Sequence, residues 1–374
     1  MIRHILRLSA AVAATAFLLG CCPKTPATSV PQVRNVILMV GDGMGLAQVS
    51  ALMIADEYAP VNMERASVGG FVKTYSASSR VTDSAASATA YSTGEKTTNG
   101  YLGVDPAGEP LETILEKAEQ KGLATGLVAT TIIQHATPGA FYTHNPDRGD
   151  YFGIALDLLP SGVDVAIGGG GAFMTERPDG RNLVDELRAQ GYMMADSLAG
   201  LDGTTSGSAM AIYPGDELPF VAHGRNPEYL PRATDKALEI LTANTPRSAG
   251  GFFLMVEGSH IDSGSHENNH EVMLGEMREF DAAVGRAFDY ADAHPGTLVI
   301  VLADHETGGL TIPSARGEEI ALPDSRVDLR WSTDSHTGTM VPMLAYGAHA
   351  ELFGGVMDNT QVNRLMERVL GLEE

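Results

Sequence analysis

The stretch Asn35-Val-Ile-Leu-Met-Val-Gly41 is an unbroken apolar run that leads directly into Asp42. Two later runs have the same form, residues 252–256 before Glu257 and residues 297–303 before Asp304 and His305. Continuous runs of Val, Ile, Leu and Met are typical of strands buried on both faces of a parallel sheet. Ligands bind such sheets at the carboxyl ends of the strands, and acids gathered there repel one another unless cations neutralise them. The pattern therefore predicts a cluster of metal ions at this edge.

Further strand and helix signals alternate along the chain. Residues 125–130, 163–167 and 340–346 have the composition of strands, whereas the apolar spacing within residues 277–288 and 362–370 is that of amphipathic helices. This alternation predicts an α/β fold with a mainly parallel central sheet flanked by helices on both faces.

Size and charge limit the classes of function. The chain has 374 residues, with 25 Lys or Arg and 47 Asp or Glu, so its net charge is −22. A nucleic-acid partner needs a basic face, and this excess of acid argues against one. The candidate site residues span most of the chain, so we expect residues 35–374 to form a single domain. Residues from about 172 to 232 carry turn signals and little chemistry, and we expect them to be an excursion from that domain.

Residues 1–20 have the form of an export signal, because Arg3 and Arg7 precede an apolar stretch that is short for a membrane span. Cys21 follows it as in bacterial lipoproteins. We therefore expect a periplasmic protein or a membrane-anchored lipoprotein, with a lipid on Cys21 as its membrane contact. An ordinary cleaved signal is the alternative. Both cysteines of the chain lie at this boundary, so no disulfide is expected in the fold, and residues 21–34 are expected to be a flexible tether.

The segment Thr82-Asp83-Ser84-Ala-Ala-Ser-Ala-Thr-Ala90 begins with capping residues and continues as an Ala-rich run. It predicts a helix with Ser84 in the first turn, where free N–H groups and the helix dipole favour an anion. A capped helix without chemistry is the alternative.

His135, Thr137 and Arg148 follow the predicted strand 125–130, so they belong to the same edge of the sheet. Thr137 offers an oxygen to a hard cation. Arg148 offers a planar fork that suits two phosphate oxygens. Taken singly, an ordinary turn and a solvated arginine would explain these residues.

The segment after Glu257 is rich in metal-binding residue types. Asp262 and His266 are four positions apart, which suits two ligands of one zinc ion. The pattern His266-Glu267-x-x-His270 also matches the zinc-protease helix, but its two central asparagines and the glycines before it disfavour a long amphipathic helix. A polar loop over residues 263–270 is the better alternative. Further along, the pair Asp304-His305 directly after a buried strand is atypical of a core, and His336 precedes the strand predicted at 340–346.

Together these motifs resemble the alkaline phosphatase family in order and spacing, from about Asn35 to the C-terminus. The residues that carry the resemblance are Asp42, the run 82–90, Thr137, Arg148, Glu257, Asp262, His266, Asp304, His305 and His336. The resemblance implies an alkaline-phosphatase-like sandwich and a single catalytic domain.

The resemblance also implies roles. Ser84 is the nucleophile that forms a covalent phosphoserine, and Arg148 clamps the phosphoryl group. The implied metal ligands are Asp262, His266 and His336 for one Zn²⁺, Asp42, Asp304 and His305 for a second Zn²⁺, and Asp42, Thr137 and Glu257 with waters for Mg²⁺. The expected activity is hydrolysis of many phosphate monoesters with release of inorganic phosphate at alkaline pH, by an enzyme of a family that commonly forms homodimers.

Two positions depart from the pattern of the well-known bacterial enzymes. His135 stands where those enzymes carry Asp, so it is expected to contact the third metal directly or through water, and Zn²⁺ or Co²⁺ is an alternative to Mg²⁺ there. Ser263 stands where the family usually carries Lys, His or Trp, so a group that helps to hold phosphate is missing.

Related chemistries remain as alternatives. Sulfatases of the superfamily need a Pro and an Arg after the nucleophile, and Ser84-Ala-Ala-Ser-Ala lacks both. Phosphodiesterase relatives typically have a Thr nucleophile and lack the magnesium site and the arginine. A metal- or phosphate-binding lipoprotein without catalysis is a third alternative, although no nucleophile or ligand is missing.

Overall fold

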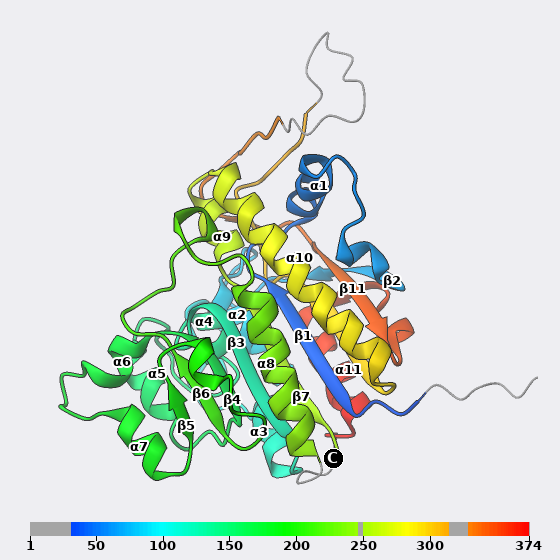
Figure 1. Ribbon diagram of the computed structural model, residues 1–374. Coiled ribbons are helices and arrows are strands. Elements are labelled where there is room, and N and C mark those ends of the chain that lie inside the picture. Colours follow the sequence, from blue (N-terminus) through cyan, green and yellow to red (C-terminus); the bar gives the residue numbers. More distant parts are fainter. Residues whose placement is uncertain (1–30, 246–249, 314–327, 374) are drawn as a thin grey trace, which may run out of the picture. The chain divides into compact units, whose positions relative to one another are not determined.

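A ten-stranded sheet runs through the part of the chain that the computed structural model describes, residues 31–245, 250–313 and 328–373 (Figure 1). The strand order is β12 (Gly355–Asp358), β2 (Val68–Lys73), β11 (Val341–Gly347), β8 (Thr297–Leu302), β1 (Asn35–Gly41), β7 (Phe252–Gly258), β3 (Ala124–Ile132), β4 (Val165–Gly169), β6 (Ala209–Ile212) and β5 (Met193–Ala195). A separate two-stranded sheet pairs β9 (Glu306–Thr307) with β10 (His336–Thr337).

The three apolar runs with acidic ends lie side by side in the sheet centre. β1 pairs in parallel with β7 on one side and β8 on the other, and Val40 is in register with both Glu257 and Leu302. The acids that end these strands therefore reach the same edge. β11 is antiparallel to both of its neighbours, β2 and β8, while the other pairs of the sheet are parallel. The predicted mainly parallel α/β fold is confirmed.

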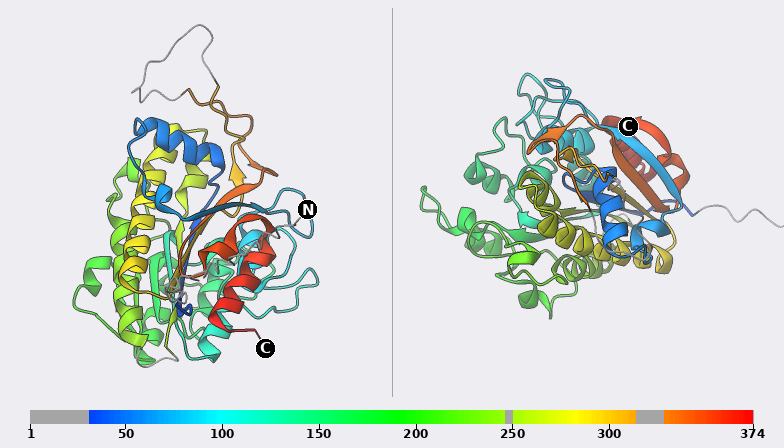
Figure 2. Two further views of the ribbon diagram at one scale, coloured as in Figure 1. Left: turned by 90° about the vertical axis from the view of Figure 1, so that its right-hand side faces the viewer. Right: turned by 90° about the horizontal axis from the view of Figure 1, so that it is seen from above.

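Helices cover both faces of the sheet. α8 (Tyr229–Asn244) and α10 (His270–Ala293) pack on one face, and α2 (Ser84–Thr93), α3 (Ile114–Gln120) and α11 (Asn359–Leu370) pack on the other (Figures 1 and 2). The remaining helices are α1 (Leu46–Ala55), α4 (Ala136–Gly139), α5 (Tyr151–Asp157), α6 (Gly171–Thr175), α7 (Leu183–Ala189), α9 (His260–His266) and the 3₁₀ turns η1 (Asn62–Arg65), η2 (Leu198–Leu201), η3 (Val221–His223) and η5 (Ala350–Phe353).

The segment from Glu257 to His270 differs from its prediction. Residues 263–266 belong to α9 rather than to a polar loop, so the loop prediction is wrong for that half. α10 starts separately at His270, and Asn268 between the two helices has a φ of 51°. A helix cannot continue through that left-handed residue, so His266 and His270 do not share one helix face as the zinc-protease pattern requires.

Other predictions fall at the ends of the chain and in its middle. The export signal, Cys21 and the tether up to residue 30 lie outside the described residues. Within residues 172–232, β5 and β6 extend one end of the sheet. Among the described residues, no helix combines the length and apolarity that a bilayer span requires.

Hydrogen bonds fix α2 against the end of β8. The Tyr91 hydroxyl donates to the carbonyl of Ala303 at 2.8 Å, and the Ser87 hydroxyl donates to the carbonyl of Asp304 at 2.7 Å. All four residues are buried. The start of α2, with Ser84, is thereby held beside the Asp304–His305 segment.

We expect Tyr91→Phe to lower the free energy of unfolding by about 1–2 kcal/mol, because it leaves the buried Ala303 carbonyl without its donor. Urea denaturation at saturating metal would measure the change. Tyr58→Phe, at a tyrosine that is 57% exposed, is the matched control and should leave stability unchanged. Equal stability of the two variants would contradict the importance of this contact.

Candidate active site

The predicted site residues gather at the carboxyl edge of the sheet. Asp42 follows β1, Glu257 lies near the end of β7, and Asp304 and His305 follow β8. Each of these four side chains is at most 1% exposed. Three sets of side chains come close enough to hold a cation, namely Asp262 with His266 and His336, Asp42 with Asp304 and His305, and Asp42 with His135 and Glu257.

The first set joins α9 to β10. Asp262 and His266 lie one turn apart on α9, with Asp262 Oδ2 at 3.2 Å from His266 Nε2. His336 comes from β10 and places its Nε2 3.1 Å from that of His266 and 3.7 Å from Asp262 Oδ1. Burial raises the pKa of Asp262, but the hydrogen bond to His266 and the nearby imidazoles outweigh it and hold that pKa below its usual value.

Hydrogen bonds orient this pair of histidines toward Asp262. His266 Nδ1 lies 2.6 Å from the carbonyl of Asp334, and His336 Nδ1 lies 3.0 Å from the carbonyl of Thr82. A carbonyl only accepts, so each Nδ1 carries a hydrogen and each Nε2 faces Asp262. The hydrogen bond to Asp262 raises the pKa of His266 to about 9, so a proton occupies His266 Nε2 where a cation would replace it. A backbone carbonyl on the far nitrogen is typical of metal-binding histidines.

The second set is buried more deeply. His305 Nε2 lies 3.2 Å from Asp304 Oδ2 and 3.5 Å from Asp42 Oδ1. Asp304 Oδ1 accepts hydrogen bonds from the backbone N–H groups of Gly43 and His305. Among the described residues, Asp304 Oδ2 and Asp42 Oδ1 have no hydrogen-bond partner, so both are free for a cation. Burial, followed by neighbouring acids, raises the pKa of Asp304 to about 6 and that of Asp42 well above its usual value.

The third set includes His135, which stands where the well-known bacterial enzymes carry Asp. Within the described structure, no hydrogen-bond partner is found for either carboxylate oxygen of Glu257, for Thr137 Oγ1 or for His135 Nδ1, and all four atoms are buried. Unpaired buried polar atoms are costly, and converging oxygen and nitrogen donors suit a divalent cation. Burial, and then Arg148, lower the pKa of His135 to about 3, so its ring is neutral and able to bind metal. Burial raises the pKa of Glu257 to about 7.

Ser84 and Arg148 are positioned by one carboxylate. Ser84 is the first residue of α2, and its Oγ lies 3.2 Å from His305 Nε2. Asp83 caps this helix by accepting from the N–H of Ala86 through Oδ1, and its Oδ2 accepts from Arg148 Nη1 at 2.9 Å. The local sequence pattern indicates only the capping role of Asp83. Its bond to Arg148 spans 65 positions of the chain, so the local pattern gave no signal of it.

Ser263 lies on α9, where its hydroxyl contacts His260 Nδ1 at 3.2 Å. The serine side chain is short and uncharged, so it brings no charge toward the site. Whether another residue helps to hold phosphate in place of the usual Lys, His or Trp stays a prediction from the sequence.

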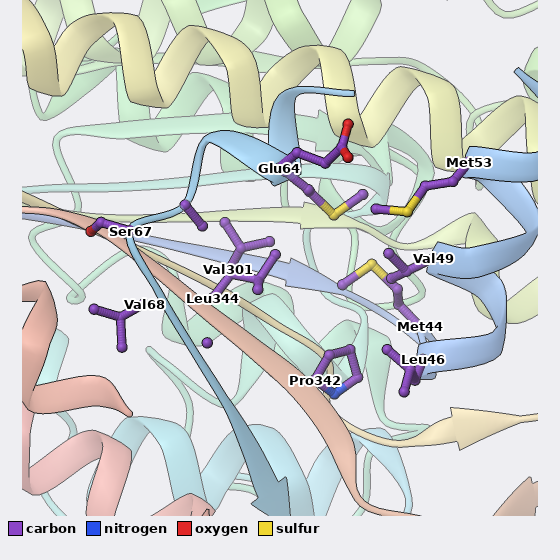
Figure 3. A pocket seen from close by; sticks show the side chains of 13 residues that line it. Met44, Leu46, Val49, Met53, Glu64, Ser67, Val68, Val301, Pro342 and Leu344 are labelled. Carbon is purple, nitrogen blue, oxygen red and sulfur yellow. The ribbon is translucent and has the colours of Figure 1, made fainter. Parts of the chain in front are cut away.

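A separate apolar pocket lies between α1, η1 and the β2–β11 pair (Figure 3). Its volume is about 340 Å³, and methionines 44, 53 and 63 contribute to its wall. Its lining includes none of the predicted site residues, so we assign it no part in the chemistry.

The fold and these sets of ligands define a metal-binding hydrolase with an α/β fold. The family model for alkaline phosphatase matches residues 33–325 and 313–372. The chain therefore belongs to the alkaline phosphatase family, and it is a phosphatase.

Similar proteins agree with this assignment. The chain is 31% identical to alkaline phosphatase 3 of Bacillus subtilis, over 91% of this chain and 89% of that protein. It is 33% identical to the alkaline phosphatase of Escherichia coli, over 91% and 86% of the two chains. The solved alkaline phosphatase of the Antarctic bacterium TAB5 superposes with a TM-score of 0.85 at 34% identity, and the match covers 92% of this chain and all of that one.

The raised carboxyl pKa values predict how the metal-free protein responds to pH. A carboxyl group with a higher pKa in the folded than in the unfolded chain adds stability at low pH, and that contribution is lost as the pH rises through the folded pKa. The folded values are about 6 for Asp304 and about 7 for Glu257. We therefore expect the metal-free protein to lose stability between about pH 5 and pH 8, and added zinc and magnesium to restore it.

Thermal unfolding in chelator and in excess metal, at about pH 5, 6.5 and 8, would measure this effect. The gap in Tm between the metal-loaded and metal-free protein should widen with pH, by roughly 5 °C or more. Glu257→Gln cannot ionise and should flatten the pH dependence of the metal-free protein. A gap that is constant with pH would contradict the prediction.

Proposed function

We propose that this phosphatase hydrolyses phosphate monoesters through a covalent phosphoserine at Ser84. The observation that carries the proposal is the position of Ser84 Oγ, 3.2 Å from His305 Nε2 at the buried start of a helix. Through His305 this hydroxyl contacts the second set, and the helix N-terminus favours the anionic substrate. Membership of the alkaline phosphatase family supports the same reaction.

We further propose that Asp262, His266 and His336 hold one Zn²⁺, and that Asp42, Asp304 and His305 hold a second. The imidazole nitrogens that converge on Asp262 support the first assignment, and the unpaired oxygens of Asp42 and Asp304 support the second. Bound cations would offset the charge that builds on the phosphoryl group and on the attacking and leaving oxygens.

A third ion is proposed at Asp42, Thr137 and Glu257, with His135 as a direct or water-mediated contact. Mg²⁺ is the first candidate, and Zn²⁺ or Co²⁺ is favoured if His135 binds directly, because imidazole suits these ions better than Mg²⁺. Two variants of the TAB5 enzyme, with a histidine replaced by Glu or Asp, hold Mg in a site named M3. That finding supports the importance of a histidine at such a site for the choice of ion.

In the proposed reaction, Arg148 holds two phosphoryl oxygens while its other bond, to Asp83, fixes its direction. Ser84 Oγ loses its proton and forms a bond to phosphorus as the ester oxygen leaves with the alcohol. Water then breaks the Oγ–phosphorus bond, returns a proton to Ser84 and releases inorganic phosphate. Activity should rise toward alkaline pH, because the hydroxyl must ionise and the carboxyl groups must be deprotonated to hold cations.

The proposed substrate range is broad. Arg148 is 29% exposed, and the roles proposed above concern the phosphoryl group rather than the alcohol. Phosphodiesterase activity is the nearest alternative, and a non-catalytic phosphate-binding lipoprotein is another. Arg148 and Glu257 favour the monoesterase over both.

We also propose that the enzyme is exported, either to the periplasm or as a lipoprotein anchored through Cys21, and that it forms a homodimer. β1 starts at Asn35 and Asp42 follows its far end, so the chain enters the sheet at the edge opposite the site. Metabolic labelling with a radioactive fatty acid and light scattering of the purified protein would test the anchor and the dimer.

We expect Ser84→Ala to lower p-nitrophenyl phosphate hydrolysis by about 10³-fold or more, because it removes the nucleophile. The assay would span about pH 6 to 11, after chelator dialysis and with zinc, magnesium or cobalt restored. Ser92→Ala is the matched control, because it removes a buried hydroxyl from the same helix that bonds the Ala140 carbonyl, and it should retain activity.

Acid quenching during turnover should leave a phosphoryl group on the peptide that contains Ser84. Activity that survives in Ser84→Ala would show that Ser84 is not the nucleophile. A wild-type protein that is inactive with every metal would instead favour a phosphodiesterase or a non-catalytic binding protein.

A further inference from the structure

Thr307 lies where the two proposed zinc sites meet, and its surroundings hold it rigidly. It is fully buried in β9, in register with His336 of β10. Its backbone N–H donates to the Gly43 carbonyl at 3.3 Å, and its carbonyl accepts from Gln48 Nε2 at 2.8 Å. The backbone of Thr307 is therefore held against β10, which carries His336, and against the loop that follows Asp42.

The side chain of Thr307 contacts one member of the first set and one of the second. Its hydroxyl donates a hydrogen bond to Asp262 Oδ1 and lies 3.1 Å from His305 Nδ1. A hydroxyl has one hydrogen, and an ionised carboxylate can only accept, so that hydrogen is directed to Asp262. The remaining contact then requires His305 Nδ1 to be the donor.

This arrangement determines the tautomer of His305. With the hydrogen on Nδ1, the lone pair of the neutral ring is on Nε2, and that atom faces Asp42 Oδ1 and Asp304 Oδ2. In the opposite tautomer Nε2 would carry a hydrogen and could not bind a cation. At the same time Asp262 is held through Oδ1, which leaves Oδ2 facing His266.

We propose that Thr307 is a positioning residue whose hydroxyl couples the two zinc sites, by fixing the tautomer of His305 and orienting Asp262. The inference rests on the proposed function for the identity of the two sites. Residues that orient metal ligands in this way typically contribute 10–100-fold to metal affinity. Loss of the Thr307 hydroxyl should therefore weaken zinc binding at both sites. Loss of a contact with one ligand would weaken binding at one site only.

The test is zinc binding by the full-length, metal-free protein, measured by competition with a chromophoric chelator. Thr307→Val keeps the shape of the side chain without the hydroxyl, and we expect it to weaken both zinc sites by about 10–100-fold. Thr307→Ser keeps the hydroxyl and should bind zinc within about threefold of wild type. Thr337→Val is the matched control, because its hydroxyl bonds Glu306 in the same hairpin and no predicted ligand.

Fluorescence of Trp331, the only tryptophan of the chain, provides a local signal for zinc binding. Its ring packs against Gly308, the residue after Thr307, so closely that a Cβ there would lie 2.3 Å from a ring atom. We expect this fluorescence to follow the same zinc concentrations as the chelator competition in each variant.

Three outcomes would overturn the inference: normal affinity of both sites in Thr307→Val, a loss at one site only, or an equal loss in Thr307→Ser or Thr337→Val. These outcomes leave the proposed reaction intact, because wild-type zinc binding and hydrolysis would be unaffected. A wild-type protein without tight zinc binding would instead overturn the proposed sites and the inference together.

Discussion

Repulsion between buried acids at the carboxyl edge of the sheet is the constraint on which the site depends. Parallel pairing of β1, β7 and β8 brings Asp42, Glu257 and Asp304 to one place, where each is at most 1% exposed. Two unit charges 4 Å apart repel by about 4 kcal/mol at an effective dielectric constant of 20. A whole domain is stable by only about 5–15 kcal/mol. The fold can keep three such acids ionised only with positive charge between them.

Backbone geometry makes this crowding sterically feasible. Gly43, directly after Asp42, has a φ of 72°, and a Cβ at this position would lie 2.8 Å from the backbone of Asp262. The absent side chain lets the loop after β1 lie against α9, and the free N–H of Gly43 holds Asp304. One glycine therefore links the acids of the first two sets.

The sequence predicted the strands and their terminal acids because a strand buried on both faces has an unmistakable composition. It also indicated the helix that starts at Ser84, since capping is a local property. It could not predict that β11 runs antiparallel, because residues 341–347 have the same composition in either direction. The local composition of residues 263–266 indicates a loop, whereas these residues form part of α9 because tertiary contacts rather than helix propensity stabilise it.

Partners that lie far apart in the chain were the features least accessible to sequence reasoning. Thr307 lies two positions after His305, yet its contact with Asp262 depends on the hairpin of β9 with β10. Asp83 also depends on a distant partner, because its bond to Arg148 exists only once α2 and the segment after α4 are folded together. Local patterns identify ligands by residue type, whereas the residues that orient them are ordinary Thr and Asp.

The groups of the site differ in how far solvent can reach them. The carboxylates of the second and third sets are inaccessible, while Arg148 is partly exposed and Ser84 stands at the end of a helix. Asp83 caps that helix and also holds Arg148, so a single carboxylate sets the spacing between the serine and the guanidinium. A carboxylate that bonds both the start of a helix and a guanidinium holds the two groups in one fixed arrangement, which a local sequence pattern does not encode.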